Sequence, residues 1–253
     1  MIVITVANKS SGFYDQLKES ADKFNVNFET LGWNQPWTGY FMKLDLMKTR
    51  MKNADPNEVF MFMDGFDTLI LRDLKPLEQM YRQNFYDKIV FSTERRDDFL
   101  NKYFVHKVLF GLIDDIALNS GIYIGTARSI SIMLDNLDTS GSNSDDQLVV
   151  TKYANLYQDR IILDKDNKLF ATWSNLDTVD LDFFDNPFTV HGTVNRDLTD
   201  TCIKLNLDVS TLHKRNYNSY YFSNAKHYIS SIFKQYYYLF FILILSLLVI
   251  YHL

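Results

Sequence analysis

The sequence predicts an α/β fold with a doubly wound, mostly parallel sheet. Short apolar runs alternate with helix-like periodic segments, as in consecutive βαβ units. Residues 59–63 form an unbroken apolar run, typical of a central parallel strand that is buried on both faces. The chain has 253 residues, of which 47% are hydrophobic, so it can fold around one substantial core.

The expected elements follow one another in a regular order. Residues 2–6 and 26–31 read as strands with a helix at 15–24 between them, so the chain opens with a βαβ unit. The further expected elements are helices at 41–52, 77–85 and 145–157, and strands at 59–63, 88–92 and 122–124. A tight turn is expected at Asn119-Ser120-Gly121, before the last of these strands.

The C-terminal segment 236–253 predicts a transmembrane helix. Its 18 residues include no Asp, Glu, Lys or Arg. As a helix they span about 27 Å, close to the hydrocarbon thickness of about 30 Å, and tyrosines stand at both ends, where membrane interfaces favour them. A buried C-terminal helix is the alternative, but a helix that is apolar on every face is hard to bury in a domain of this size.

The flanking charges predict the orientation in the membrane. Basic residues precede the apolar segment at 214, 215, 226 and 234, whereas its far end holds only His252. The positive-inside rule therefore places the main domain in the cytosol, on a single-pass C-terminal tail anchor. The N-terminus lacks the basic and long apolar regions of a cleaved signal peptide. The expected organisation is a folded domain over 1–198, a membrane-proximal linker over 199–235 and the transmembrane helix over 236–253.

Composition narrows the classes of function. The net charge of -5 gives no broad basic surface, so nucleic acid is not an expected partner. The single cysteine, Cys202, cannot form an internal disulfide and is expected to be a small buried hydrophobe. Trp33, Trp37 and Trp173 have the shape to stack on a sugar or a uracil ring, although packing in the core is the expected role of each.

Two acids, Asp64 and Asp67, follow the expected central strand. In open α/β sheets ligands bind beyond the carboxyl ends of the strands, and carboxylates suit Mg²⁺ or Mn²⁺ shared with a substrate diphosphate. For these two residues alone, capping of the next segment by turn acids is equally consistent. The spacing argues against a haloacid-dehalogenase-like phosphatase, whose second acid stands two residues after the first, where this chain has Phe66.

Later segments hold three further groups of candidate residues. Asn119 lies just before Gly121, where the missing side chain permits close approach of a ligand. Asp145 and Asp146 begin an expected helix, where acids also simply stabilise the helix dipole. His191 ends an apolar strand, and a lone histidine there is more often structural than a metal ligand.

These motifs occur in a specific order over residues 2–195: VITVAN, MFMDGFDTLIL, FSTE, LNSGIYIG, DDQL and VHG. In that order and spacing they resemble the glycosyltransferase domain of the procollagen lysyl hydroxylases, including its giant-virus relatives. The resemblance implies a GT-A-like fold, a UDP-sugar donor and Mn²⁺, or Mg²⁺, as the cofactor. It makes residues 1–198 a glycosyltransferase-like domain.

The resemblance also implies roles for individual residues. The implied metal ligands are Asp64, Asp67 and His191. The implied contacts to the donor and its diphosphate are Thr5, Lys43, Asp64, Asn119, Gln147 and Gly192. The implied catalytic acids are Asp145 and Asp146, which position the donor sugar or the acceptor, or act as the base.

The chain departs from the family pattern in two places. RRDDFLNKYF follows Glu94 where the family has a tryptophan-containing segment that borders the acceptor, so a different acceptor-bordering segment is expected. Thr193 and Val194 replace the usual asparagine and glycine after VHG, so the contacts to the diphosphate there are expected to differ from the family pattern. A chain of this length also leaves no room for the family's hydroxylase domains, so lysine hydroxylation is not expected of it.

The function expected from the sequence is metal-dependent transfer of glucose or galactose from a UDP-sugar to a hydroxyl acceptor. The acceptor that the resemblance implies is hydroxylysine or galactosyl-hydroxylysine of a collagen-like protein, and a viral setting would agree with a cytosolic domain, on a host membrane or in a virion. The alternative is a catalytically degenerate, tail-anchored membrane protein that binds a glycan or a partner. Retention of the two acids, the DDQ motif and the histidine argues against that alternative.

Overall fold

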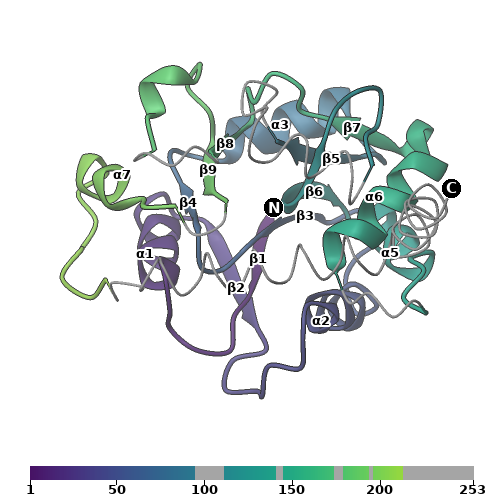
Figure 1. Ribbon diagram of the computed structural model, residues 1–253, viewed down its shortest axis with the longest axis horizontal. Helices are drawn as coiled ribbons and strands as arrows, with labels where there is room; N and C mark the ends of the chain where they lie inside the picture. Colours follow the sequence, from purple (N-terminus) through teal and green to yellow (C-terminus); the bar gives the residue numbers. More distant parts are fainter. Residues whose placement is uncertain (95–110, 141–144, 174–178, 194–195, 213–253) are drawn as a thin grey trace, which may run out of the picture. The chain divides into compact units, whose positions relative to one another are not determined.

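The computed structural model describes residues 1–94, 111–140, 145–173, 179–193 and 196–212. All of these lie in the first of the two units into which the chain divides, Met1–His213. Their main feature is a six-stranded sheet in the order β2-β1-β3-β6-β5-β7 (Figure 1). Its strands are β1 (Ile2–Val6), β2 (Asn27–Leu31), β3 (Val59–Met63), β5 (Ile89–Thr93), β6 (Leu118–Thr126) and β7 (Ile161–Leu163). Only β6 runs against the others, which confirms the predicted α/β fold with a mostly parallel sheet.

Helices cover both faces of this sheet. They are α1 (Tyr14–Lys23), α2 (Phe41–Met51), α3 (Lys75–Asn84), α5 (Ala127–Asp135) and α6 (Asp146–Leu156), with a short 3₁₀ turn η2 (Gln158–Arg160) after α6. Because strand side chains alternate between faces, Ile4 packs with the residues of α2, α5 and α6, whereas Val3 packs with those of α1 and α3. Figure 1 shows α2, α5 and α6 gathered on one side of the strands.

A second sheet of three strands, in the order β4-β9-β8, continues from the first. Its strands are β4 (Thr68–Ile70), β8 (Phe170–Trp173) and β9 (Thr189–Gly192), and η3 (Leu181–Phe183) and α7 (Thr199–Lys204) complete the described elements. Cys202 of α7 is fully buried against Leu69 and Val190, as expected for a small hydrophobe. α7 lies at the start of the range predicted as a linker, and its buried side chains pack it against the second sheet.

The Asn119-Ser120-Gly121 segment lies inside β6, so the expected turn there is wrong. β6 pairs with β3 on one side and with β5 on the other, with Met63 opposite Ile122 and Ser92 opposite Asn119. Pairing with β5, in which Asn119 and Leu118 lie opposite Ser92 and Thr93, extends the strand back to Leu118 through residues whose local preference is for a turn.

No helix among the described residues is long and apolar enough to cross a membrane. The predicted transmembrane segment at 236–253 lies outside the described residues, as does the predicted linker beyond residue 212. The tail anchor and the predicted domain boundaries therefore stay predictions.

Candidate functional site

The candidate site is built where the chain crosses from the first sheet to the second. β3 ends at Met63 and β4 begins at Thr68, so residues 64–67 are the crossing itself. Strand pairing places Ile122 of β6 opposite Met63 and His191 of β9 opposite Thr68. Residues that are far apart in the sequence therefore meet beside the two acids that follow the central strand.

Asp64, Asp67 and His191 each offer one ligand atom, and these atoms lie within 4.8 Å of one another. The Nε2 atom of His191 is 3.5 Å from Oδ1 of Asp67. The absence of a side chain at Gly121 lets His191 and Asp64 approach the strand here, because a Cβ atom would lie 2.3 Å from Cε1 of His191 and 2.9 Å from Oδ2 of Asp64. Two carboxylates and an imidazole around a glycine cradle fit a divalent cation such as Mn²⁺.

Thr5 and Gly192 hold the backbone of the crossing. The hydroxyl of Thr5 donates to the carbonyl of Met63 at 2.7 Å, and the amide of Gly192 donates to the carbonyl of Asp67 at 2.8 Å. Both residues are buried. Their hydrogen bonds fix the backbone beside Asp64, Asp67 and His191, the three candidate ligands that are called the metal cluster below. The donor contacts implied for Thr5 and Gly192 stay predictions.

Lys43 of α2 joins the crossing to α6. Its Nζ lies 2.9 Å from Oδ1 of Asp64 and 2.6 Å from Oδ2 of Asp146. Burial lowers the pKa of Lys43, but Asp146 and Asp64 outweigh burial and raise that pKa well above its usual value. The side chain is therefore an ammonium ion held between two carboxylates.

The residues of the DDQ motif lie in different positions. Asp145 is the N-cap of α6: its Oδ1 accepts hydrogen bonds from the amides of Gln147 and Leu148 at 3.0 and 3.2 Å. Asp146 is buried and turns toward Lys43 instead. The amide oxygen of Gln147 is 3.4 Å from the hydroxyl of Ser120. Ser120 directly precedes Gly121 in β6, beside the metal cluster. Asp145 therefore caps the N-terminus of α6, whereas Asp146 is linked to Asp64 through Lys43.

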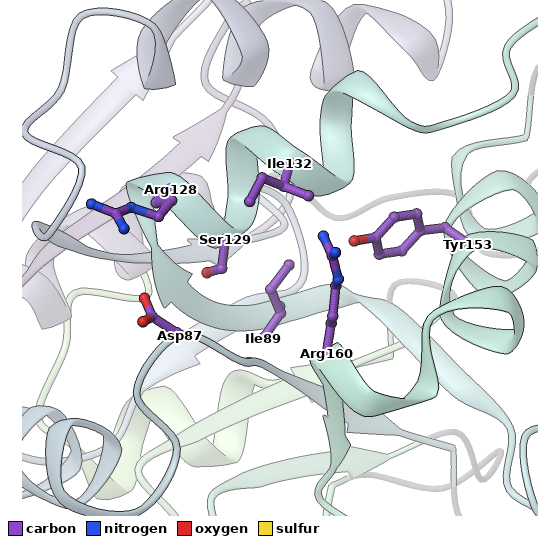
Figure 2. Close-up of a pocket in the computed structure, with 7 residues that line it drawn as sticks. All are labelled: Asp87, Ile89, Arg128, Ser129, Ile132, Tyr153 and Arg160. Carbon is purple, nitrogen blue, oxygen red and sulfur yellow. The ribbon is translucent and has the colours of Figure 1, made fainter.

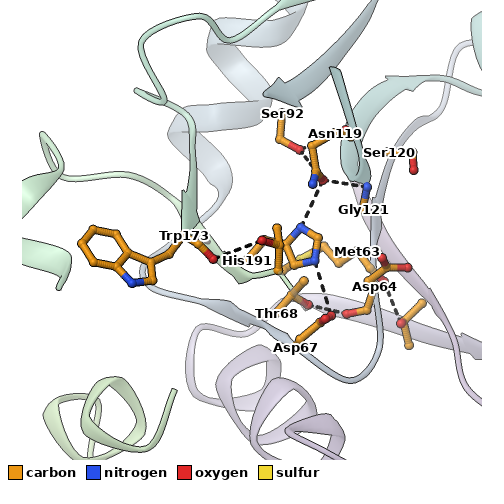
Figure 3. Close-up of polar contacts among 12 residues, drawn as sticks. Met63, Asp64, Asp67, Thr68, Ser92, Asn119, Ser120, Gly121, Trp173 and His191 are labelled. Atoms are coloured by element: carbon orange, nitrogen blue, oxygen red, sulfur yellow. Dashed lines mark hydrogen bonds and ion pairs between the residues drawn. The ribbon is translucent and has the colours of Figure 1, made fainter. Parts of the chain in front are cut away.

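Behind His191 lies a polar chain that sequence reasoning missed (Figure 3). Nδ1 of His191 is 3.1 Å from Oδ1 of Asn119, and Nδ2 of Asn119 donates to Oε1 of Glu94 at 2.7 Å. Burial lowers the pKa of His191, but Asp67, followed by Asp64 and Glu94, raises it above its usual value. The one sequence signal for Glu94 was its place directly after the strand of FSTE.

The tryptophans divide into two groups. Trp173 is buried in the core beneath the second sheet, as expected. Trp33 and Trp37 are 42% and 43% exposed, so core packing is the wrong expectation for them. Trp37 meets Tyr40 edge to face at 6.2 Å, and Nζ of Lys43 lies 5.8 Å from the Tyr40 ring. Exposed aromatic rings therefore lie beside the ammonium group of Lys43.

A separate cavity of about 230 Å³ lies between α5, α6 and the starts of β5 and β7 (Figure 2). It is lined by Asp87, Ile89, Arg128, Ser129, Ile132, Tyr153 and Arg160. Because Ile89 begins β5, this cavity is at the opposite end of the strands from Asp64. None of the predicted site residues lines it.

Comparison with known proteins agrees with this geometry. The family model described as the PLOD GT domain matches residues 1–229. The chain is 30% identical over 162 residues to procollagen-lysine,2-oxoglutarate 5-dioxygenase 1 of Bos taurus, covering 60% of this chain and 22% of the relative. It is 30% identical over 191 residues to procollagen-lysine,2-oxoglutarate 5-dioxygenase 2 of Homo sapiens, covering 68% of this chain and 25% of the relative. The chain thus spans about a quarter or less of the curated relatives it matches.

Among solved structures, an active-site mutant of LgtC has the same fold. The TM-score is 0.50 at 12% identity, over 85% of this chain and 98% of that one. The family match covers nearly the whole chain, including every residue of the metal cluster. This chain therefore belongs to the family of PLOD glycosyltransferase domains.

Proposed function

We propose that the chain is a metal-dependent glycosyltransferase that moves glucose or galactose from a UDP-sugar to a hydroxyl acceptor. The observation that carries this proposal is the cluster of Asp64, Asp67 and His191 around the Gly121 cradle, at the ligand-binding edge of a PLOD glycosyltransferase domain. A nucleoside diphosphate leaving group needs positive charge as the glycosyl bond breaks. The cluster and its neighbour Lys43 lie where that charge can be supplied.

The residues of the site would share the work as follows. Asp64, Asp67 and His191 would hold Mn²⁺ or Mg²⁺, which when bound offsets the charge developing on the diphosphate. The ammonium of Lys43 adds a fixed positive charge beside Asp64. Lys43 also holds Asp146 in place, which suits positioning of the donor sugar or the acceptor hydroxyl.

For the acceptor we propose hydroxylysine or galactosyl-hydroxylysine of a collagen-like protein. The support is the family and the names of the relatives, which are procollagen-lysine enzymes. The segment that follows Glu94 departs from the family pattern and lies outside the described residues.

We also propose that residues 236–253 anchor the domain to a membrane from the cytosolic side. The support is the sequence: an apolar segment without Asp, Glu, Lys or Arg, preceded by basic residues. Protease added to intact membrane vesicles should digest the domain. Protection of the domain until detergent is added would contradict this orientation.

The enzymatic proposal is tested by turnover and by ligand-dependent stability. Purified full chain should hydrolyse UDP-glucose or UDP-galactose only with Mn²⁺ or Mg²⁺. UDP with Mn²⁺ should also raise the melting temperature of the chain. A ligand that binds only the folded state stabilises that state by about 2.7 kcal/mol when its concentration is a hundred times Kd. Asp67→Ala should abolish both effects, whereas Asp182→Ala, at a carboxylate that is 87% exposed, should change neither. A wild-type chain that shows no turnover and no stabilisation would favour a degenerate protein that binds a glycan or a partner.

A further inference from the structure

Asn119 directs its side-chain amide into the protein. The residue is only 3% exposed. Its Oδ1 accepts from the backbone amide of Gly121 at 2.9 Å and from the hydroxyl of Ser92 at 3.1 Å (Figure 3). Its Nδ2 donates to Glu94 at 2.7 Å. A donor sugar would find little free surface on this side chain, so a different role follows from its contacts.

These contacts fix which way round the amide lies. A backbone N–H can only donate, so the Asn119 atom that faces Gly121 has to be the oxygen. The other end then presents its N–H₂ group to the carboxylate of Glu94, which accepts. Glu94 is 4% exposed, so the pair is held by the protein and is shielded from competing water.

The orientation of the amide in turn selects the tautomer of His191. The Asn119 oxygen lies 3.1 Å from Nδ1 of His191 and can only accept, so Nδ1 has to carry the hydrogen. In the neutral ring, Nε2 then presents its lone pair on the side of Asp67, 3.5 Å away. A metal-binding histidine needs a bare nitrogen on the metal side and commonly donates its other N–H to an oxygen behind it.

We infer that Asn119 and Glu94 are positioning residues that lock His191 with Nδ1 protonated and Nε2 facing the metal cluster. The inference rests on the proposed metal site. It gives Asn119 a role behind the histidine in place of the implied donor contact. It also gives Glu94 a function, since its carboxylate holds the amide in the orientation that the histidine requires.

The direct test reads the tautomer without metal or substrate. Long-range ¹H–¹⁵N spectra of the full chain, labelled at its five histidines, distinguish the two tautomers at about pH 9, above the usual range of histidine pKa values. The His191 signals are those lost in His191→Gln. The wild-type ring should be the Nδ1–H form, and Asn119→Ala and Glu94→Ala should shift it toward a mixture.

The second readout is affinity for Mn²⁺, measured by electron paramagnetic resonance of the free ion. Asn119→Ala and Glu94→Ala should raise the Kd by about 10–100-fold, as loss of the partner behind a metal-binding histidine does. Glu94→Gln keeps an oxygen that accepts from Asn119 and should stay close to wild type. Ser92→Ala is the matched control, because it removes one donor to Asn119 but keeps the Gly121 and Glu94 contacts.

An Nε2–H ring in the wild-type chain would overturn the inference. So would unchanged tautomer and Mn²⁺ affinity in Asn119→Ala and Glu94→Ala, with cooperative unfolding confirming that both variants are folded. If the alanine variants do not fold, the wild-type tautomer and the Glu94→Gln spectrum decide. Failure of the proposed glycosyl transfer would instead show as absent turnover, with the tautomer left as described.

Discussion

Nζ of Lys43 lies 2.6 Å from Oδ2 of Asp146, and the same nitrogen is 2.9 Å from Oδ1 of Asp64. One ammonium ion thus joins the first turn of α6 to the crossing between the two sheets. The side chains of Lys43 and Asp146 are each 12% exposed, so solvent screens the pair only weakly. Two parts of the site are therefore tied together by a single residue of α2.

Replacing Lys43 by methionine should damage both stability and turnover. The change leaves Asp64 and Asp146 close together without their cation, which should lower the free energy of unfolding by about 2–3 kcal/mol, as partly exposed acids lose less than fully buried ones. Turnover should fall at least about 100-fold, because a charge preorganised beside the diphosphate is lost. Urea unfolding and UDP-sugar hydrolysis measure the two effects.

Lys48→Met on the same helix is the control for that experiment. Lys48 pairs with Asp135 at 2.8 Å, but the two side chains are 38% and 55% exposed. Such a surface pair contributes about 0–1 kcal/mol. Equal losses of turnover in the two variants would contradict a specific role for Lys43.

Gly121→Ala should abolish metal binding while leaving a folded domain. The added Cβ would overlap the His191 ring and crowd Asp64, so the ligand atoms would have to move apart. Gly125→Ala on the same strand is matched to it, since its Cβ would lie 2.9 Å from Oγ of Ser129, away from the cluster. Both variants should lose about 1–3 kcal/mol from overpacking, but only Gly121→Ala should lose Mn²⁺ binding in a titration.

Local sequence patterns predicted the elements that position the site. The apolar run of β3 and the first strand have the expected bounds, because a buried central strand requires continuous apolar residues. Asn119, Ser120 and Gly121 misled because each favours a turn in isolation, whereas pairing of Asn119 with Ser92 of β5 and a hydrogen bond from the Asp64 amide to the Gly121 carbonyl hold the segment in a strand. Pairing between distant segments cannot be deduced from local preference.

Some residues of the site could be predicted from the sequence and others could not, again because contacts between distant segments do not show in local patterns. The order of motifs identified Asp64, Asp67 and His191, and the structure brings their ligand atoms together. It gave no sign that Glu94 reaches His191 through Asn119, because that contact exists only once three strands are assembled. Exposure of Trp37 is likewise a property of the fold around it.

The metal-free protein should lose stability as pH rises through the folded-state pKa of His191. That pKa is raised above its usual value of about 6.5, so the folded state holds the proton more tightly than the unfolded chain does. The resulting stability is fully present below the unfolded pKa and disappears above the folded one. Urea midpoints measured from about pH 6 to 9 should show this fall, and His191→Gln should flatten it.

Mn²⁺ should reverse that trend. Metal binding needs a bare Nε2, so the proton competes with the ion and the stabilisation by Mn²⁺ should increase over the same pH range. The comparison is made at fixed Mn²⁺ concentration, with the metal-free series as its baseline. A stabilisation by Mn²⁺ that is independent of pH would show that His191 is not a ligand.

Trp37→Ala should weaken substrate binding without unfolding the domain. Trp37 is 43% exposed and touches Tyr40, whose ring lies beside Lys43, so it is placed to stack on a ring that approaches the site. Loss of one aromatic stack removes about 0.5–1.5 kcal/mol, which is a rise of about 2–10-fold in KM for the UDP-sugar or the acceptor. The free energy of unfolding should change by less than about 0.5 kcal/mol, as for other exposed positions. Trp37→Phe keeps a ring and should restore most of the affinity, whereas an unchanged KM in Trp37→Ala would remove this residue from the binding surface.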